Sequence, residues 1–247
     1  MDFEGYLVES ARRFAESGAA PVLARQAATV LLLRPPFEVY LIRRARTMAF
    51  AAGMYAFPGG GVDLRDRDVD WVAPAHRLGL PDDEARAVAC AAVREVFEET
   101  GILLAGRTAD DVLPDVSGPE WERARRAVET REVGLAQVLQ DRGLVLRADL
   151  LVPWSRWITP EFEPRRFDTY FFVAPMPLGQ RTRDPGGETS HETWRRPDDA
   201  ADLPMLPPTR ANLAQLARYD SIDAALAADH DVSTPVLPTV VDGRLVY

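Results

Sequence analysis

Several features that mark particular classes of protein are missing from this sequence. Its 247 residues include a single cysteine, Cys90, so no disulfide can form within the chain. No apolar run approaches the length of a transmembrane helix, and the acidic residues 1–10 do not resemble a secretory signal. The formal net charge of −9 disfavours nucleic acid and anionic membranes as main partners. We therefore expect a cytoplasmic protein that has neither a membrane nor a nucleic acid as its partner.

The apolar patterns that are present alternate between the periods of strands and helices. This mixture predicts an α/β or α+β protein, and we see no linker that would separate two independent cores, so we expect one domain over residues 1–247. The predicted strands are 25–34, 37–44, 54–63, 151–160 and 167–177. The predicted helices are 3–17, 81–100, 119–142 and 208–229. Residues 180–191 are predicted to be a polar loop, and residues 236–247 are a tail with some strand character.

The helix predicted over residues 81–100 carries an unusual cluster of acid. The segment "REVFEETG", Arg94 to Gly101, places Glu95, Glu98 and Glu99 on one helical face. Like charges at this spacing repel one another, so the arrangement is costly unless a cation neutralises it. Hard divalent cations such as Mg²⁺ prefer oxygen ligands, usually a few carboxylates together with substrate phosphates. The opposite face is apolar, and it predicts that the helix packs on a sheet.

A glycine-rich turn precedes this helix in the sequence. The segment "FPGGG", residues 57–61, ends a predicted strand at a point where the backbone can approach a ligand closely. Glycine carbonyls can face a metal ion there, and glycine amides can face a phosphate. Cys90 lies in an apolar helical run, so we interpret it as a small buried side chain and not as a nucleophile.

Together these segments resemble the Nudix hydrolase family, whose signature is G-x5-E-x7-R-E-U-x-E-E-x-G-U with U apolar. Residues 94–102 match every fixed position of its second half. When the signature is counted from Gly60, its first glutamate falls on Asp66 and its arginine would fall on residue 74. The arginine that begins the matching second half is instead Arg94. The box is therefore split by an insertion within residues 64–84. The candidates for its first acid are Asp66, Asp83 and Glu84.

The resemblance implies an α/β/α sandwich around a mixed sheet, with helical additions at residues 1–20 and 208–247. It implies hydrolysis of a nucleoside diphosphate linked to another moiety, by attack of water on phosphorus, with Mg²⁺ or Mn²⁺ as cofactor. The metal ligands that it implies are Glu98, Glu99, Glu95 and the Gly59 carbonyl, with Glu95 acting as a ligand or as general base; Arg94 would orient a glutamate of the same face, and Gly60 would contact substrate.

A further carboxylate often comes from a late loop in this family. The segment "GGETSHETW" is similar to the family's late E-x5-W pattern, because Glu188 lies six residues before Trp194. Glu192 and His191 compete with Glu188 for this catalytic role, and an exposed polar loop explains each of them equally well.

The segment "GMYAFPGG" is similar to the coenzyme A diphosphatase branch, and "RRFDTYFF" and the split box resemble its larger acyl-coenzyme A members. That branch has an arginine and a histidine just before the glycine, where this chain has Met48, Ala49 and Ala51. Arginines that could serve an anionic substrate are Arg43, Arg44, Arg46, Arg165 and Arg166. The alternatives are hydrolysis of ADP-ribose, NDP-sugars or dinucleotides, or a non-catalytic ligand sensor. The sequence leaves a homodimer open.

Overall fold

The centre of the molecule is a mixed sheet with the strand order β10-β2-β1-β9-β8. We analysed a computed structural model, which describes residues 3–44, 53–73, 78–183 and 189–247. The strands are β1 (Arg25–Arg34), β2 (Glu38–Arg44), β8 (Val152–Ile158), β9 (Phe167–Pro175) and β10 (Thr189–Arg195). Strands β1 and β9 pair in parallel, and the other neighbours in this order are antiparallel. The predicted α/β class with a mixed sheet is confirmed.

Two short strands attach the glycine-rich segment to this sheet. They are β3 (Tyr55–Ala56), which pairs with β2, and β4 (Gly59–Gly61), which pairs with β1. The single strand predicted over 54–63 is therefore wrong in its length, because Phe57 and Pro58 separate two pairings with different partners.

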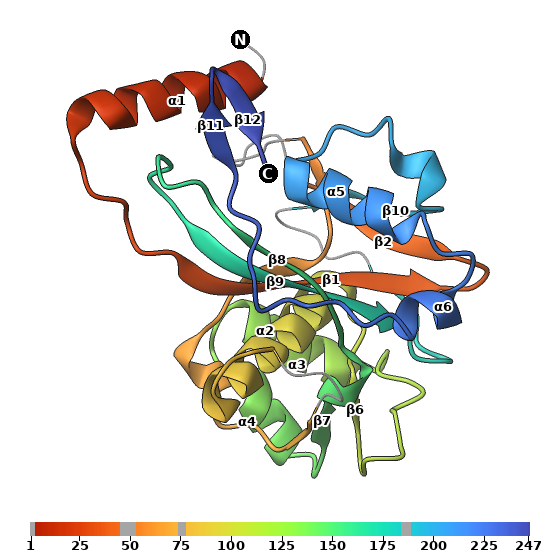
Figure 1. Ribbon diagram of the computed structural model, residues 1–247. Helices are drawn as coiled ribbons and strands as arrows, with labels where there is room; N and C mark the ends of the chain where they lie inside the picture. Colours follow the sequence, from red (N-terminus) through yellow and green to blue (C-terminus); the bar gives the residue numbers. More distant parts are fainter. Residues whose placement is uncertain (1–2, 45–52, 74–77, 184–188) are drawn as a thin grey trace.

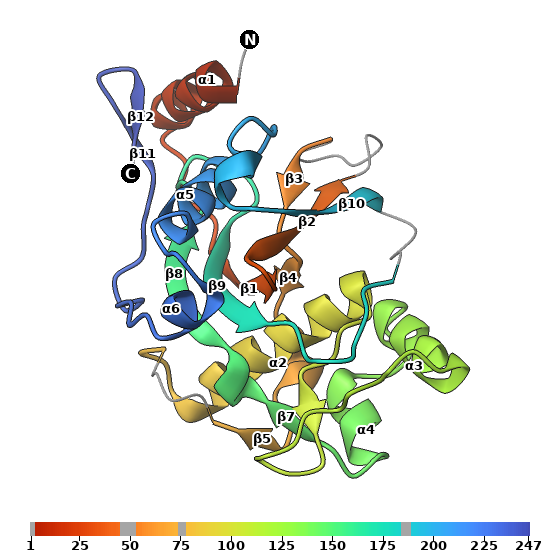
Figure 2. The ribbon, with the colours of Figure 1, turned by 90° about the vertical axis from the view of Figure 1, so that its right-hand side faces the viewer.

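Helices cover both faces of the sheet (Figure 1). On one face lie α2 (Asp82–Thr100), α3 (Pro119–Glu129) and α4 (Leu135–Gln140), and on the other lie α5 (Pro207–Leu216) and α6 (Ile222–Leu226). The view in Figure 2 shows the sheet between these two layers. Each layer has its own apolar core: Val88, Val93 and Phe97 of α2 are fully buried against one face, while Leu213 and Leu216 of α5 pack with Trp154 on the other.

Two predicted helices are each broken in two. The prediction of one helix over 119–142 is wrong because the chain turns at Thr130–Gly134, where Arg131 has a positive φ of 62°. The prediction over 208–229 is wrong because α5 ends at Leu216 and Ser221 caps a new helix, α6, with its side chain. The predicted polar loop at 180–191 overlaps the start of β10, an edge strand that pairs with β2.

The insertion predicted within residues 64–84 contributes to a second, smaller sheet. After a 3-10 turn, η1 (Leu64–Asp66), the strand β5 (Trp71–Val72) pairs with β7 (Val145–Arg147), which also pairs with β6 (Ala105–Gly106). The Asp63 side chain caps the 3-10 turn by accepting from the Arg65 amide at 3.0 Å, and Asp66 accepts in return from the Asp63 amide at 2.8 Å. These two hydrogen bonds fix the position of the Asp66 side chain.

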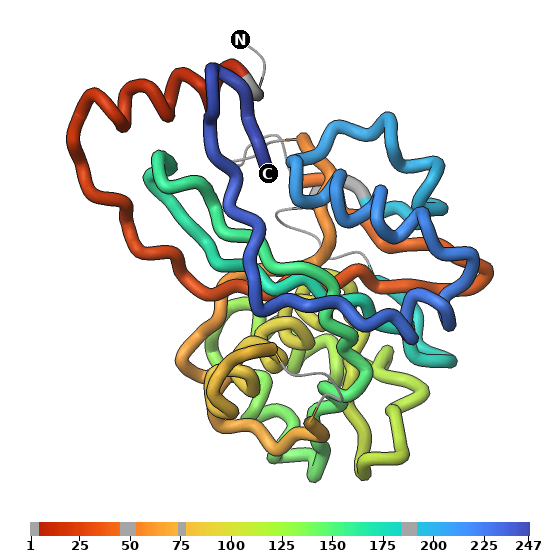
Figure 3. The backbone as a smooth tube through the Cα atoms, viewed as in Figure 1, coloured from red at the N-terminus to blue at the C-terminus, as the bar shows by residue number. Residues whose placement is uncertain are grey.

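Residues from the two ends of the described chain lie side by side. Helix α1 (Phe3–Ser17), predicted over the same residues, contacts the hairpin of β11 (Thr239–Val241) and β12 (Arg244–Val246), as the tube in Figure 3 shows. The strand character predicted for the tail is confirmed by this hairpin. Across the described part of the chain, none of the helices combines the length and the apolar character that crossing a bilayer requires.

Candidate active site

Helix α2 carries the acidic face, and its boundaries follow from the sequence. Pro81 precedes its first turn, where Asp82 and Asp83 suit the positive end of the helix dipole. It ends at Gly101, whose φ of 73° lies in the left-handed region and whose amide donates to the Phe97 carbonyl at 3.0 Å. Cys90 is fully buried, as predicted. The helix is therefore fixed by one apolar face and by the Gly101 cap at its C-terminal end.

Three glutamates lie on the other face of α2, and their environment favours the protonated form. Burial raises the pKa of Glu95 to about 7, and the charge of Glu98 adds to this effect while Arg94 opposes it. Burial likewise raises the pKa of Glu98. The pKa of Glu99 is raised well above its ordinary value by burial and by the charge of Glu95. The cluster therefore holds more negative charge than its surroundings stabilise.

Arg94 is the cation that holds this cluster together. Its Nε donates to Asp66 at 2.9 Å, and its Nη1 donates to Glu95 at 2.7 Å and to Glu98 at 3.1 Å. These carboxylates raise the pKa of Arg94 although burial opposes the rise. The predicted pairing of Arg94 with a glutamate of its own face is confirmed.

Asp66 supports Arg94 from outside the helix. Its side chain is 1% exposed and receives a second bond from Arg94 Nη2, at 3.1 Å. The other candidates for the first acid of the split box point elsewhere: Glu84 accepts from Gln26 at 2.8 Å, and Asp83 is exposed in the first turn of α2. Of the three, Asp66 alone contacts Arg94 within the described residues.

The glycine-rich strand β4 lies against this face of α2. The Gly59 amide donates to Glu99 at 2.9 Å, and Arg94 Nη2 donates to the Gly61 carbonyl at 2.7 Å. In an antiparallel strand, the N–H and the C=O of one residue point to the same edge, and this edge alternates from residue to residue. Because the Gly59 amide points to Glu99, the Gly59 carbonyl also points away from β1. A Cβ on Gly59 would lie 2.6 Å from the backbone carbonyl oxygen of Ala28, and one on Gly60 would displace the Glu95 carboxylate. Glycine is therefore required at residue 59, and at residue 60 it leaves room for Glu95.

Comparisons with known proteins agree with this geometry. Residues 74–206 match the family model described as the NUDT19 Nudix domain, which is more than half of the chain. The chain belongs to this Nudix family. The crystal structure of a NUDIX hydrolase from Alicyclobacillus acidocaldarius superposes with a TM-score of 0.71 at 28% identity, covering 84% of this chain and 97% of that one.

Curated relatives of this Nudix chain include two acyl-coenzyme A diphosphatases called NUDT19. The protein from Xenopus laevis is 24% identical over 76% of this chain and 61% of its own length. The human protein is 28% identical over 76% of this chain and 64% of its own length. The chain thus spans somewhat less than two thirds of the length of these relatives.

The Nudix residues fit a divalent cation by the chemistry of their donors. Among the residues that the structure describes, no three acidic, histidine or cysteine side chains already form a metal site. Glu95 and Glu98 turn toward Arg94, and Glu99 turns toward the Gly59 amide. The donors are nevertheless all hard oxygen atoms, and their raised pKa values show a surplus of negative charge that a cation would remove.

The remaining predicted catalytic residues of the Nudix site have different surroundings. Glu188 lies outside the described residues. Glu192 lies on β10 and accepts a hydrogen bond of 2.5 Å from the hydroxyl of Tyr40, a buried residue of β2. Its register partner is Ile42, whose side chain packs in the core on the α2 face, so Glu192 lies on that face of the sheet.

The predicted substrate arginines divide into two groups. Arg44 lies close enough to Glu99 to lower the pKa of that carboxyl, although burial dominates. Arg43 donates to the Gly53 carbonyl at 3.1 Å and lies over the ring of Tyr55. Arg166 instead donates to the backbone carbonyls of Thr159 and Val22, at 2.9 and 2.8 Å, so its head group holds chain segments together. Arg43 and Arg44 lie at the end of β2, and their contact with substrate stays a prediction; Arg46 lies outside the described residues.

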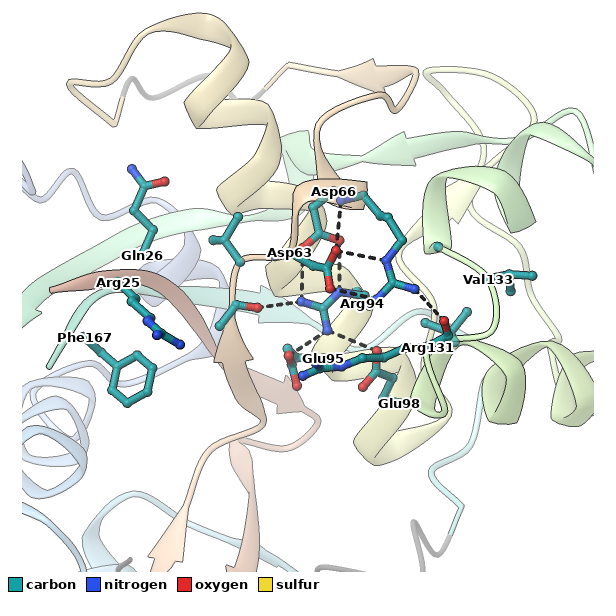
Figure 4. A pocket seen from close by; sticks show the side chains of 15 residues that line it. Arg25, Gln26, Asp63, Asp66, Arg94, Glu95, Glu98, Arg131, Val133 and Phe167 are labelled. Atoms are coloured by element: carbon teal, nitrogen blue, oxygen red, sulfur yellow. Dashed lines mark hydrogen bonds and ion pairs between the residues drawn. The ribbon is translucent and has the colours of Figure 1, made fainter. Parts of the chain in front are cut away.

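A cavity of about 390 Å³ opens beside the acidic cluster. Glu95, Glu98 and Arg94 form part of its wall, and Figure 4 shows Arg25 and Phe167 together on one side of them, and the side chain of Arg131 directed from the opposite wall toward Glu95 and Glu98. Sequence reasoning did not name Arg25, Phe167 or Arg131 as site residues, because they lie far apart along the chain; Phe167 belongs to the segment "RRFDTYFF", but Arg25 and Arg131 belong to no motif. The positive φ of Arg131 has no sequence signal either, since glycine is the usual residue in that conformation.

Proposed function

We propose that this Nudix chain is a Mg²⁺- or Mn²⁺-dependent pyrophosphohydrolase whose substrate is coenzyme A or an acyl-coenzyme A. One observation carries the reaction class: Glu95, Glu98 and Glu99 share one buried face, with the guanidinium of Arg94 as the cation that contacts two of them. The close approach of three buried carboxylates is unfavourable without a metal ion. A role in binding a divalent cation explains why the chain has them together.

The side chains have distinct roles in this proposal. Glu95, Glu98, Glu99 and the Gly59 carbonyl would hold the cation, which supplies charge stabilisation at phosphate oxygens and a more acidic water. Asp66 holds Arg94, and Arg94 fixes the directions of Glu95 and Glu98. The proton acceptor is Glu192, Glu188 or Glu95. Of these, Glu192 is positioned by Tyr40 on the face of the sheet that carries α2.

The choice of coenzyme A rests on relatives and motifs. The curated relatives include acyl-coenzyme A diphosphatases, and "GMYAFPGG" is similar to the motif of the coenzyme A branch. The arginine and histidine of that motif are missing, and the positions that replace them, Ala49 and Ala51, lie outside the described residues. Recognition of the substrate therefore requires other cations.

A panel of diphosphates with Mg²⁺ or Mn²⁺ tests the proposal. It would contain coenzyme A, an acyl-coenzyme A, ADP-ribose, an NDP-sugar and a dinucleotide, with products separated by chromatography. We expect coenzyme A to be cleaved to 3′,5′-ADP and 4′-phosphopantetheine with the highest kcat/KM of the panel. Turnover restricted to ADP-ribose or dinucleotides would reject coenzyme A but keep the reaction class. No turnover of any member would favour the non-catalytic ligand sensor.

A further inference from the structure

The cavity beside the acidic cluster has one wall whose charges are paired. Asp63 accepts from Arg65 at 2.7 Å, and Asp66 binds Arg94 at 2.9 Å, so these pairs offer little charge to a ligand. Glu95 and Glu98 share the same Arg94 and leave a negative surplus on this wall. This is the wall to which the proposed function assigns the cation and the scissile diphosphate.

The cavity also contains positive charge that no protein group neutralises. Arg25 and Arg131 line it, and within the described residues neither guanidinium has a hydrogen-bond or ion-pair partner. The other two arginines that line the cavity, Arg65 and Arg94, are each bound to a carboxylate. Among the lining residues, Arg25 and Arg131 are therefore the cations that are available to an anion.

Arg25 is placed beside an aromatic ring by the sheet itself. It is the first register partner of Phe167 in the parallel ladder of β1 and β9, and Figure 4 shows the two side chains together. Phe167 is 39% exposed although it lines the cavity, so one face of its ring is open to a ligand. An exposed aromatic ring beside an arginine suits a planar base that carries a phosphate.

Arg131 occupies a backbone conformation that its side chain makes unfavourable. It follows the last turn of α3 with a φ of 62°, at a position where helices usually have glycine. Its carbonyl accepts from Arg65 at 2.7 Å, which ties this turn to the η1 segment that carries Asp66. A strained residue whose side chain lines a cavity is a candidate for function, because glycine would serve the turn better.

We infer that Arg25, Arg131 and Phe167 form a nucleotide subsite that binds a phosphomonoester additional to the scissile diphosphate. The inference rests on the proposed function, because it needs the diphosphate to lie at Glu95 and Glu98. Phe167 stacks on the base, and the two guanidiniums bind the extra phosphate, a dianion that accepts bidentate hydrogen bonds from arginine. Arg166, which was predicted from the sequence to bind substrate, is replaced in this role by Arg25, since its own head group binds backbone carbonyls.

Binding of two product-like nucleotides to the metal-free protein tests the subsite without requiring turnover. Adenosine 3′,5′-bisphosphate and AMP share the base and the 5′-phosphate and differ only in the second phosphomonoester. By titration calorimetry we expect the wild type to bind the bisphosphate at least about tenfold more tightly, since a charge-assisted contact is worth at least this factor. Arg25→Gln and Arg131→Gly should each abolish most of this preference, whereas Phe167→Ala should weaken both nucleotides alike.

Two controls separate loss of the contact from loss of the fold. Arg123→Gln removes an exposed arginine of α3 that does not line the cavity, and it should leave both affinities unchanged. Arg131→Gly removes the strained side chain, so its melting temperature should equal or exceed that of the wild type while its preference disappears.

Two results would overturn the subsite. One is a full preference for the bisphosphate in either arginine variant, and the other is an equal loss for both nucleotides, which would place the arginines on the 5′-phosphate. Neither result would affect the proposed reaction, which the diphosphate panel tests separately. Conversely, a wild type that hydrolyses no diphosphate would reject the proposed function, although the binding experiment would still report on the arginines.

Discussion

Helices α2 and α3 both carry glutamates at helical spacing, yet they balance the charge in opposite ways. On α3, Glu122 pairs with Arg125 at 2.8 Å and with Arg126 at 3.0 Å, and Arg125 also reaches Glu129 at 3.3 Å. These pairs lie three or four residues apart along the helix, the spacing at which opposite charges attract. Glu122 and Glu129 of α3 therefore each have a cation within about one helical turn.

On α2 the same spacing brings glutamates together instead. Glu95 and Glu98 share the guanidinium of Arg94, Glu99 accepts from the Gly59 amide instead, and burial raises the pKa of Glu95 to about 7. The hydrogen bonds of Arg125 lower the pKa of Glu122 to about 2. Glutamate thus forms stabilising ion pairs on α3, whereas on α2 its negative charges are crowded together. The charge balance around a glutamate, and not its presence on a helix, indicates which face is built for a ligand.

The largest effect expected from this comparison is on catalysis. Glu98→Gln keeps the shape of the side chain but removes an anionic metal ligand, so kcat/KM should fall at least about a hundredfold. The matched variant Glu122→Gln should change kcat/KM by less than about threefold. Rates would be measured on the preferred diphosphate at saturating Mn²⁺, with circular dichroism as a check on folding. Near-normal activity of Glu98→Gln would contradict the ligand assignment.

Metal binding should stabilise the protein through α2 alone. At a Mn²⁺ concentration about a hundredfold above Kd, the free energy of unfolding should rise by about 2.7 kcal/mol, or about 5–10 °C in Tm. Glu99→Gln should reduce this shift, and Glu129→Gln should retain it, because Glu129 pairs with Arg125 and is not among the proposed ligands. Thermal melts with and without Mn²⁺ measure the shift, and equal shifts in the two variants would reject Glu99 as a ligand.

The pH dependence of stability should differ in sign between the two helices. The raised pKa of Glu95 means that the metal-free folded state binds more protons than the unfolded state between about pH 4.5 and 7. Stability should therefore be highest at the acid end of this window and fall by about 3 kcal/mol toward pH 8. Denaturant unfolding at several pH values tests this, and Glu95→Gln should flatten the fall.

Glu122 should contribute a pH dependence of stability of the opposite sign, because its pKa is lowered. Its lowered pKa contributes stability above about pH 4.5 that is lost as the pH falls toward about 2. Because its side chain is 31% exposed, screening limits the effect to about 1 kcal/mol. Glu122→Gln should remove this acid-side loss and leave the neutral range unchanged. A variant that instead altered the slope between pH 5 and 7 would contradict the assignment of that window to α2.

The smallest effect concerns the proton acceptor. If Glu192 positions water, Glu192→Gln should lower kcat about tenfold with little change in KM. Tyr40→Phe removes the 2.5 Å hydrogen bond to Glu192 and should lower kcat less. Steady-state kinetics of both variants give the test, and unchanged kcat in Glu192→Gln would move the role to Glu188 or Glu95.

Local signals predicted the boundaries of β1 and α2 because both elements have strong end markers. Pro81, the acids that follow it and Gly101 delimit α2, and its acidic face could be read directly from the spacing of the glutamates. The break at Thr130–Gly134 was missed because Arg131 adopts its left-handed conformation without a glycine to signal it. Strand β10 was missed because a polar edge strand resembles a loop in composition.

The site was predictable only where its residues share a helix. The cluster on α2 needs no tertiary information, and a residue count from Gly60 offered Asp66 as one of three partners for Arg94. The cavity, by contrast, joins Arg25 of β1 to Arg131 beyond α3. Such contacts depend on strand order and on turns, which leave no periodic signal in the sequence. The β5-β7-β6 sheet was missed for a related reason, since its strands have only two or three residues.

The parallel ladder between β1 and β9 has a consequence for the order in which the protein folds. Its first pair joins Arg25 to Phe167, so β1 must wait for its central partner until 142 further residues have been synthesised. At ribosomal rates of about 5–20 residues per second this delay is about 7–28 s. During that time β1 can pair only with β2 and β4, and its other edge is open. The nascent chain therefore carries its glycine turn and acidic helix for several seconds before the inferred nucleotide subsite can form.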